Sequence, residues 1–199
     1  MPGPHAHVVR WAIQLDRLLK GGGVFVNLDD ETLSRSSEVG VLAHRGIGQL
    51  LTAGAPPDPS VILEVAKSLV SEFPKIESRA HAQLVAGAIS SYFTNHLPSG
   101  NWMFAGHELQ LGSGRIDLLW TTFNDHKMLD EIKTGASRKL FLTRTRDQME
   151  RYREAAVAAW GPDFVGIRLI STTDPRKSRF IRPDGSNCSL ASASFLKDL

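Results

Sequence analysis

Two carboxylates and a lysine in the second half of the chain have the types and spacing to share one reaction. Asp117 lies within the apolar stretch Arg115–Thr122, and Glu131 and Lys133 occur in the next apolar stretch. A carboxylate in an apolar strand is unfavourable unless it is paired, hydrogen-bonded or bound to a cation. Alternate residues of a strand share a face, so Glu131 and Lys133 point the same way while Ile132 faces the opposite layer. If the two strands form a hairpin, Asp117 lies near Glu131.

This set of groups suits the hydrolysis of phosphodiester bonds. Two converging carboxylates form a hard-oxygen site for Mg²⁺ or Mn²⁺, and the backbone carbonyl of Ile132 could complete the protein ligands. Such a cation lowers the pKa of a bound water and neutralises phosphate charge, while Lys133 orients the water or stabilises the transition state. The same residues would also serve as a buried structural salt bridge, and these three side chains alone do not separate the two interpretations.

The elements that must position these groups are predicted from apolar periodicity and from helix start and stop signals. Ser60 is the expected N-cap of one helix, Pro74 is the expected first residue of the next, and Gly161-Pro162 ends the last. The predicted helices cover residues 8–19, 37–51, 61–72, 74–96 and 145–160. The predicted strands cover residues 102–111, 115–122, 128–133 and 164–171. This order indicates an α/β domain with a mixed central β-sheet flanked by helices and with extra N-terminal helices.

Composition narrows the class of protein. The chain has 199 residues, of which 42% are hydrophobic and 22% charged, which suits one packed domain. Its single cysteine, Cys188, excludes a disulfide framework and a cysteine-based zinc or iron–sulfur site within the chain. No apolar run reaches the roughly 18–20 residues that span a bilayer, and the N-terminus lacks the features of a signal peptide. We therefore expect a cytoplasmic protein in a reducing compartment, with no membrane partner.

Positive charge is concentrated in the last third of the chain. The segment from Lys133 to Arg182 contains 12 Lys or Arg and 5 Asp or Glu, a net charge of +7, whereas the whole chain has a net charge of +2. A basic surface of this kind fits a phosphate-rich partner, although a dispersed solvated surface has the same composition. The basic residues expected to rim the site are Arg138, Lys139, Arg144 and Arg146. Those expected to extend this surface are Arg176, Lys177, Arg179 and Arg182.

Three further polar residues occupy positions where they could support the site. Gln148 and Tyr152 are four residues apart on the predicted helix, which places them on one face. His44 lies among apolar residues of an earlier predicted helix, at the end of the segment Gly40-Val-Leu-Ala-His44. A lone histidine in such a setting is more often a core residue than a ligand, so spacing alone leaves its role open.

These motifs resemble the PD-(D/E)XK nuclease superfamily, and in particular its RecB-like branch, which includes helicase-linked nuclease domains and CRISPR-adaptation nucleases. The resemblance rests on the order of four short motifs: Gly40–His44, Asp117, Glu131-x-Lys133 and Gln148-x-x-x-Tyr152. It covers roughly residues 36–172 and implies a restriction-endonuclease-like core. We accordingly place the nuclease-like domain at residues 36–182, after an N-terminal extension at 1–35 and before a C-terminal tail at 183–199.

The resemblance also implies a role for each matching residue. The implied metal ligands are His44, Asp117 and Glu131, and the implied catalytic residues are Asp117, Glu131 and Lys133. Glu108 would support the site by reaching the metal through water. Gln148 and Tyr152 would contact substrate DNA or brace the site.

The chain departs from the family pattern in two respects. Ile116 stands where the superfamily's name has a proline, which is common in this branch. The cysteines that hold an iron–sulfur cluster in many relatives are missing, so no cluster is expected. Because the sequence has no helicase motif and no Walker A loop, a helicase or recombination partner would be a separate chain.

The expected function is therefore a Mg²⁺- or Mn²⁺-dependent deoxyribonuclease, exonuclease-like or structure-dependent, acting on single-stranded DNA or duplex ends in repair, phage replication or defence. One alternative is a catalytically inactive nuclease fold that binds nucleic acid or acts as a scaffold. Another is a metal hydrolase with a different substrate, using His44, Asp117 and Glu131. The basic last third of the chain favours a polyanionic substrate.

Overall fold

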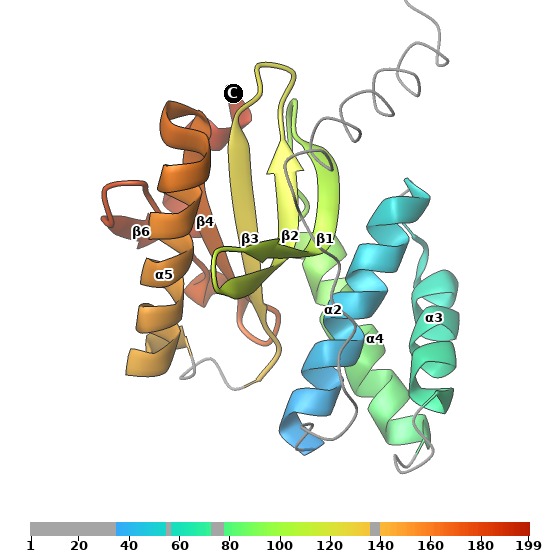
Figure 1. Ribbon diagram of the computed structural model, residues 1–199. Coiled ribbons are helices and arrows are strands. Elements are labelled where there is room, and N and C mark those ends of the chain that lie inside the picture. The colour runs from blue at the N-terminus through green and yellow to red at the C-terminus, as the bar shows by residue number, and fades with distance from the viewer. Residues whose placement is uncertain (1–34, 55–56, 73–77, 136–139) are drawn as a thin grey trace, which may run out of the picture.

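The computed structural model describes residues 35–54, 57–72, 78–135 and 140–199, in which a six-stranded sheet carries helices on both faces (Figure 1). The strands are β1 (Met103–Leu111), β2 (Gly114–Thr121), β3 (Lys127–Lys133), β4 (Phe164–Ser171), β5 (Arg179–Ile181) and β6 (Asn187–Ser189). The helices are α2 (Arg35–Ala53), α3 (Pro59–Ser71), α4 (Ser78–Asn95) and α5 (Thr143–Trp160), and the 3₁₀ turns are η3 (Gly161–Asp163), η4 (Pro175–Lys177), η5 (Leu190–Ser192) and η6 (Ser194–Lys197). The predicted α/β class with a mixed, helix-flanked sheet is confirmed.

The strands follow one another across the sheet in chain order. Every neighbouring pair is antiparallel except β3 and β4, which are parallel. Parallel neighbours need a crossover connection, and α5 lies in that connection. The sheet is thus mixed because α5 connects β3 to β4 as parallel neighbours, whereas β1–β3 and β4–β6 are antiparallel.

Two hydrophobic cores hold the three layers together. On one face of the sheet, α2, α3 and α4 share a core with sheet side chains such as Leu118 and Ile132. On the other face, α5 packs on side chains such as Leu129 and Leu169. Neighbouring residues of β3 therefore enter different cores, as the period of a strand requires, and the predicted orientation of Ile132 away from Glu131 is confirmed.

The helix boundaries agree with the predicted ones to within a few residues, with one correction. Ser60 is not the N-cap of α3; Asp58 is, and its carboxylate accepts hydrogen bonds from the backbone N–H groups of Ser60 (2.8 Å) and Val61 (3.1 Å). Pro59 is compatible with the first helical position because it has no N–H to leave unpaired there. The helix begins two residues earlier than predicted for this reason. The predicted helix over 8–19, residues 1–34 of the predicted extension and the predicted helix start at Pro74 lie outside the described residues, and Arg35, the last residue of that extension, is instead the first residue of α2.

The two last strands were not predicted. Each contains only three residues, which is too short for an apolar alternation to be recognised. The residues after position 182 nevertheless pack against the domain: β6 pairs with β5, and Leu196 is buried. The indole N–H of Trp102, just before β1, donates to the backbone carbonyl of Leu196 at 2.7 Å. The chain end therefore lies against the start of the first strand.

A buried ion pair ties the sheet to the helical layer. Asp130 of β3 is fully buried and accepts a two-pronged interaction from the guanidinium of Arg168 on β4, with Nε to Oδ1 at 2.6 Å and Nη2 to Oδ2 at 2.5 Å. The Tyr92 hydroxyl of α4 and the Trp120 indole N–H of β2 donate to the same carboxylate at 2.6 and 2.9 Å. Burial and the Asp130 charge raise the pKa of Tyr92 well above its usual value, which keeps its hydroxyl a donor. Side chains from β2, β4 and α4 thus all contact the buried carboxylate of β3.

No helix in the described part of the chain is both long and apolar enough to cross a bilayer.

Candidate active site

The β2–β3 hairpin brings Asp117 and the Glu131–Lys133 segment together, as predicted. The register pairs Leu118 with Asp130, so Asp117 lies beside the last residues of β3. The backbone N–H of Ile132 donates to Asp117 Oδ2 at 2.6 Å. This bond fixes the carboxylate at the end of the hairpin, away from the turn.

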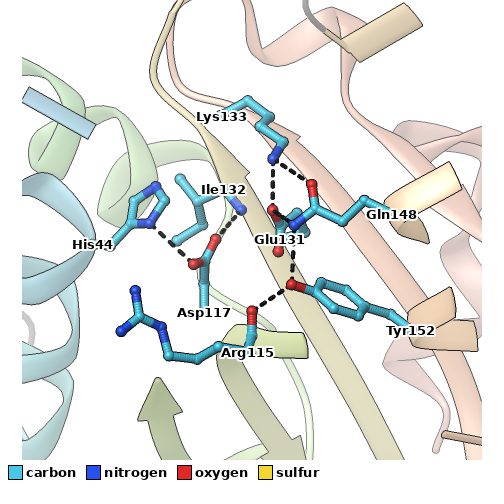
Figure 2. A network of polar contacts seen from close by, with 8 residues as sticks. All are labelled: His44, Arg115, Asp117, Glu131, Ile132, Lys133, Gln148 and Tyr152. Carbon is cyan, nitrogen blue, oxygen red and sulfur yellow. Dashed lines mark hydrogen bonds and ion pairs between the residues drawn. The ribbon is translucent and has the colours of Figure 1, made fainter. Parts of the chain in front are cut away.

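His44 of α2 completes one side of the site (Figure 2). Its Nδ1 lies 3.0 Å from Asp117 Oδ1, and the two side chains are only 20% and 15% exposed. Although burial opposes it, Asp117 raises the pKa of His44 above its usual value. Burial likewise opposes ionisation of Asp117, but the neighbouring His44, the Ile132 N–H and Lys133 hold the pKa of its carboxyl below the usual value. Asp117 is therefore an anion that accepts a hydrogen bond from Nδ1 of His44, and in the neutral form of His44 this leaves Nε2 as the acceptor.

Glu131 and Lys133 form the other side of the site. Lys133 Nζ donates to Glu131 Oε1 at 2.6 Å and to Gln148 Oε1 at 3.1 Å, and Gln148 Nε2 donates to the same Glu131 oxygen at 2.9 Å. Burial and the nearby Asp117 charge raise the pKa of Glu131 to about 7, against the opposing effect of Lys133. Glu131 is thus a carboxylate that the surrounding protein only partly stabilises in its charged form.

Helix α5 contributes a second polar residue, Tyr152, one turn after Gln148. Gln148 Nε2 lies 3.0 Å from the Tyr152 hydroxyl, and this hydroxyl donates to the backbone carbonyl of Arg115 at 2.5 Å. Figure 2 shows the result: a continuous series of contacts from Lys133 through Gln148 and Tyr152 back to β2. The predicted placement of Gln148 and Tyr152 on one helix face, directed at the site, agrees with this geometry.

A glycine makes room for Tyr152. A Cβ atom at Gly114, the first residue of β2, would overlap the Tyr152 ring at Cε1. Glycine inside or at the start of a strand often marks such a close approach. Gly114 therefore sets the position of the tyrosine and, through Gln148, the position of Lys133.

Replacing Gly114 by alanine is expected to lower activity of the site without unfolding the protein. The added methyl group would move the Tyr152 ring and lengthen its bond to the Arg115 carbonyl, so Gly114→Ala should resemble Tyr152→Ala, with roughly a tenfold loss in either case. Catalytic rates and thermal melts of both variants and of the double variant test this. If the two losses multiply in the double variant, Gly114 does not act through Tyr152.

Two polar atoms at the site are buried without a partner among the described residues: Nε2 of His44 and Oε2 of Glu131. Buried polar atoms in proteins nearly always have a partner, so these two atoms mark where a ligand would bind. Both atoms are electron-pair donors, and an imidazole nitrogen with a carboxylate oxygen suits a divalent cation. The carboxylate that holds His44 Nδ1 is the usual partner of a metal-bound histidine.

The geometry does not, however, assemble a complete set of ligands. In the ranges that the structure describes, no group of three His, Cys, Asp or Glu side chains is arranged to hold a metal ion. Both oxygens of Asp117 already accept a hydrogen bond, one from His44 and one from the Ile132 N–H. The predicted three-ligand centre at His44, Asp117 and Glu131 therefore remains a prediction, as does the Ile132 carbonyl as a ligand.

The remaining predicted residues lie at the edge of the site or outside the described ranges. Glu108 lies in β1 without a partner of its own in the β1–β2 register, has a left-handed backbone (φ 52°), and forms no hydrogen bond or ion pair with any described residue. Arg144 and Arg146 are exposed on the first turn of α5. Arg138 and Lys139 lie outside the described residues.

Sequence reasoning missed four contributions to this site. The Ile132 N–H and the Arg115 carbonyl are backbone groups, which carry no signal in residue type. The Arg115 side chain was also not singled out, although Figure 2 shows its guanidinium extending beside Asp117 below His44. Gly114 did carry a signal, since a glycine at the start of an apolar strand favours a close contact.

Comparison with known proteins finds no family model that matches the chain, and no curated protein or solved structure with significant similarity to it. The site must therefore be interpreted from its own geometry.

Proposed function

We propose that the protein is a metal-dependent deoxyribonuclease of the PD-(D/E)XK superfamily, in its RecB-like branch, built on a restriction-endonuclease-like core. The observation that carries this proposal is the joining of Asp117 to Glu131-x-Lys133 across one hairpin, with His44 bound to Asp117. The sequence resemblance implies this arrangement, in which two acidic residues and a lysine lie at one strand end and a histidine comes from a preceding helix. The helix with Gln148 and Tyr152 follows in the same order.

The residues divide into those that hold a cation and those that position it. Nε2 of His44 and Oε2 of Glu131 are the unpaired donors, and Asp117 supplies further lone pairs while it orients His44. When bound there, Mg²⁺ or Mn²⁺ would supply an activated water and neutralise charge on the phosphate. Gln148 and Lys133 both donate to Oε1 of Glu131, which orients the carboxylate and leaves Oε2 free.

Lys133 is placed to act on the reacting phosphate. Its side chain is 22% exposed, whereas the side chain of Glu131 that it contacts is 5% exposed, so the lysine is the more open partner of the pair. Gln148 of α5 accepts a hydrogen bond from the Lys133 ammonium group. A fixed cation at this position stabilises the charge that develops on the phosphate in the transition state.

The substrate class follows from charge. Arg144 and Arg146 are exposed on the first turn of α5, the helix that carries Gln148, which suits a polyanion. Cytoplasmic DNA, as single strands or duplex ends, is the proposed substrate, with a helicase or recombination protein as a separate partner. Repair, phage replication and defence are the processes in which such domains act.

Replacing Asp117 by alanine is expected to remove metal binding and cleavage together. In wild type, Mn²⁺ at about 100 times its dissociation constant should stabilise the fold by about 2.7 kcal/mol, and end-labelled DNA should be cut unless EDTA is present. Asp117→Ala should lose this stabilisation and reduce cutting to the EDTA level. Asp163→Ala, which removes an exposed carboxylate, is the matched control and should behave as wild type. Cutting by Asp117→Ala at the wild-type rate would refute the proposed site.

The second candidate is an inactive nuclease fold that binds nucleic acid. One observation favours it: Glu131 and Lys133 already satisfy each other at 2.6 Å, as a structural ion pair would. In that case DNA binding persists with no metal-dependent cleavage in wild type. Linear, circular, single-stranded and duplex DNA and RNA, assayed side by side, distinguish the two candidates and define the polarity.

A further inference from the structure

Two consecutive apolar residues are left in solvent immediately before α5. Phe141 and Leu142 are each 53% exposed, whereas Leu140 beside them is 3% exposed and enters the core under α5. Single exposed apolar residues are ordinary, but two in a row beside a polar site indicate a contact surface.

The sheet register connects this pair to the site. Glu131 of β3 lies opposite Leu169 of β4, and Leu169 lies opposite Arg179 of β5. Residues that are directly opposite on paired strands point to the same face, so these three form one row beneath α5. Strand spacing places Arg179 about 10 Å from Glu131. The Arg179 guanidinium carbon is 5.7 Å from the centre of the Phe141 ring, within the range of a cation–π contact.

The surroundings of Phe141 are positively charged. Arg144 and Arg146 follow it on the first turn of α5, are exposed, and form no ion pair with any residue that the structure describes. Arg179 likewise has no acidic partner in the described part of the chain. Asp147 is the acidic residue nearest in sequence on this turn. An aromatic ring that contacts Arg179 and is followed by two exposed arginines suits a ligand with flat apolar groups and phosphates, because bases stack on aromatic rings and arginines neutralise phosphates.

We propose that Phe141 and Arg179 form a stacking platform for an unpaired base of single-stranded DNA, with Arg144 and Arg146 holding the adjoining phosphates. A base can stack on an aromatic ring only when its own face is free, which a duplex does not allow without opening. Phe141 keeps half of its surface exposed although Arg179 covers part of it, so the ring retains area for a base. This inference rests on the proposed nuclease function and narrows it to a single-stranded substrate.

The test is binding of a labelled single-stranded 20-mer and of the matching duplex in EDTA, where no metal-dependent cleavage occurs. Phe141→Ala is expected to weaken single-strand binding by roughly 5- to 100-fold, the usual range for the loss of one stacked base, and to leave duplex binding within about twofold. Phe123→Ala is the matched control, because Phe123 is 52% exposed in the turn between β2 and β3, at the far end of the hairpin. It should bind as wild type.

A second measurement reports the stacking itself. Tryptophan fluorescence of Phe141→Trp should be quenched by oligothymidylate beyond the quenching seen in wild type, and that of Phe123→Trp should not. Thermal melts show whether each variant is folded. If Phe141→Ala does not fold, the comparison of Phe141→Trp with Phe123→Trp tests the platform in its place.

The results separate the platform from the nuclease. Single-strand affinity that is unchanged in Phe141→Ala, or lost equally for single strand and duplex, overturns the platform whether or not the wild type cuts DNA. Single-strand binding that depends on Phe141, in a wild-type protein that never cuts DNA with Mg²⁺ or Mn²⁺, supports the platform and refutes the nuclease.

Discussion

Replacing Lys133 by alanine is expected to reduce DNA cleavage by about 10²- to 10³-fold and to leave DNA affinity within a few-fold of wild type. Removing one preorganised group that stabilises developing charge has an effect of this size on the chemical step. Under the proposed function, binding should change little because the lysine would act mainly in the transition state and the exposed arginines would hold the phosphates. Glu131 keeps its hydrogen bond from Gln148, so the fold should survive the substitution. Single-turnover cleavage, anisotropy and thermal melts measure the three quantities.

The matched control is Lys127→Ala. Lys127 lies at the other end of β3, is 5% exposed and pairs with Asp125, so this variant also removes a lysine from an ion pair of the same strand. It should cut DNA at the wild-type rate. If Glu131 and Lys133 are only a structural pair, Lys133→Ala should instead lose about 3–5 kcal/mol of stability. A variant that melts far below wild type yet cuts at the wild-type rate per folded molecule would end the assignment of this site.

Replacing Asp130 by alanine is expected to lower the free energy of unfolding by about 3–5 kcal/mol, the largest stability effect that we expect from a single polar substitution. The change leaves the Arg168 guanidinium, 5% exposed, without its counter-ion, and removes the acceptor of the Tyr92 and Trp120 donors. Urea unfolding followed by circular dichroism measures the loss. Asp130 belongs to the face of β3 opposite Glu131, so the effect is on folding rather than on the reaction.

Two further variants serve as references for the loss of stability expected in Asp130→Ala. Lys67→Ala removes an exposed pair with Glu64 on α3 and should change stability by less than about 1 kcal/mol. The double variant Asp130→Leu/Arg168→Met replaces the buried pair by apolar groups and should be more stable than Asp130→Ala. A loss for Asp130→Ala as small as that for Lys67→Ala would show that the buried pair is not a main link between sheet and helices.

The carboxylates and lysine of the site were predictable because their signal is local. Asp117 stands out in an apolar strand, and the spacing of Glu131 and Lys133 alone predicts a shared face. The partner of His44 was not predictable from spacing, since α2 and β2 are separated by two further helices in the chain. Only the family resemblance connected them before the structure placed Nδ1 of His44 at 3.0 Å from Asp117.

Asp130 shows the limit of sequence reasoning more clearly. It adjoins Glu131 in an apolar stretch, and nothing in its own neighbourhood distinguishes a structural from a catalytic carboxylate. Its partner Arg168 is 38 residues away on a strand that pairs in parallel, so the contact depends on a register that periodicity does not determine. The short strands β5 and β6 were missed because their pairing, rather than their residue pattern, defines them.

Helix α5 is both the crossover between β3 and β4 and the carrier of Gln148 and Tyr152. Proteins open in cooperative units below the level of global unfolding, and a crossover helix held by one apolar face can be such a unit. Detachment of α5 would leave the hairpin and the His44–Asp117 pair in place but release Lys133 and Glu131 from Gln148. The equilibrium between docked and detached α5, and not the global stability, then sets the fraction of molecules with an assembled site. A molecule that inserts beneath this helix would therefore inhibit the protein without contacting a single carboxylate.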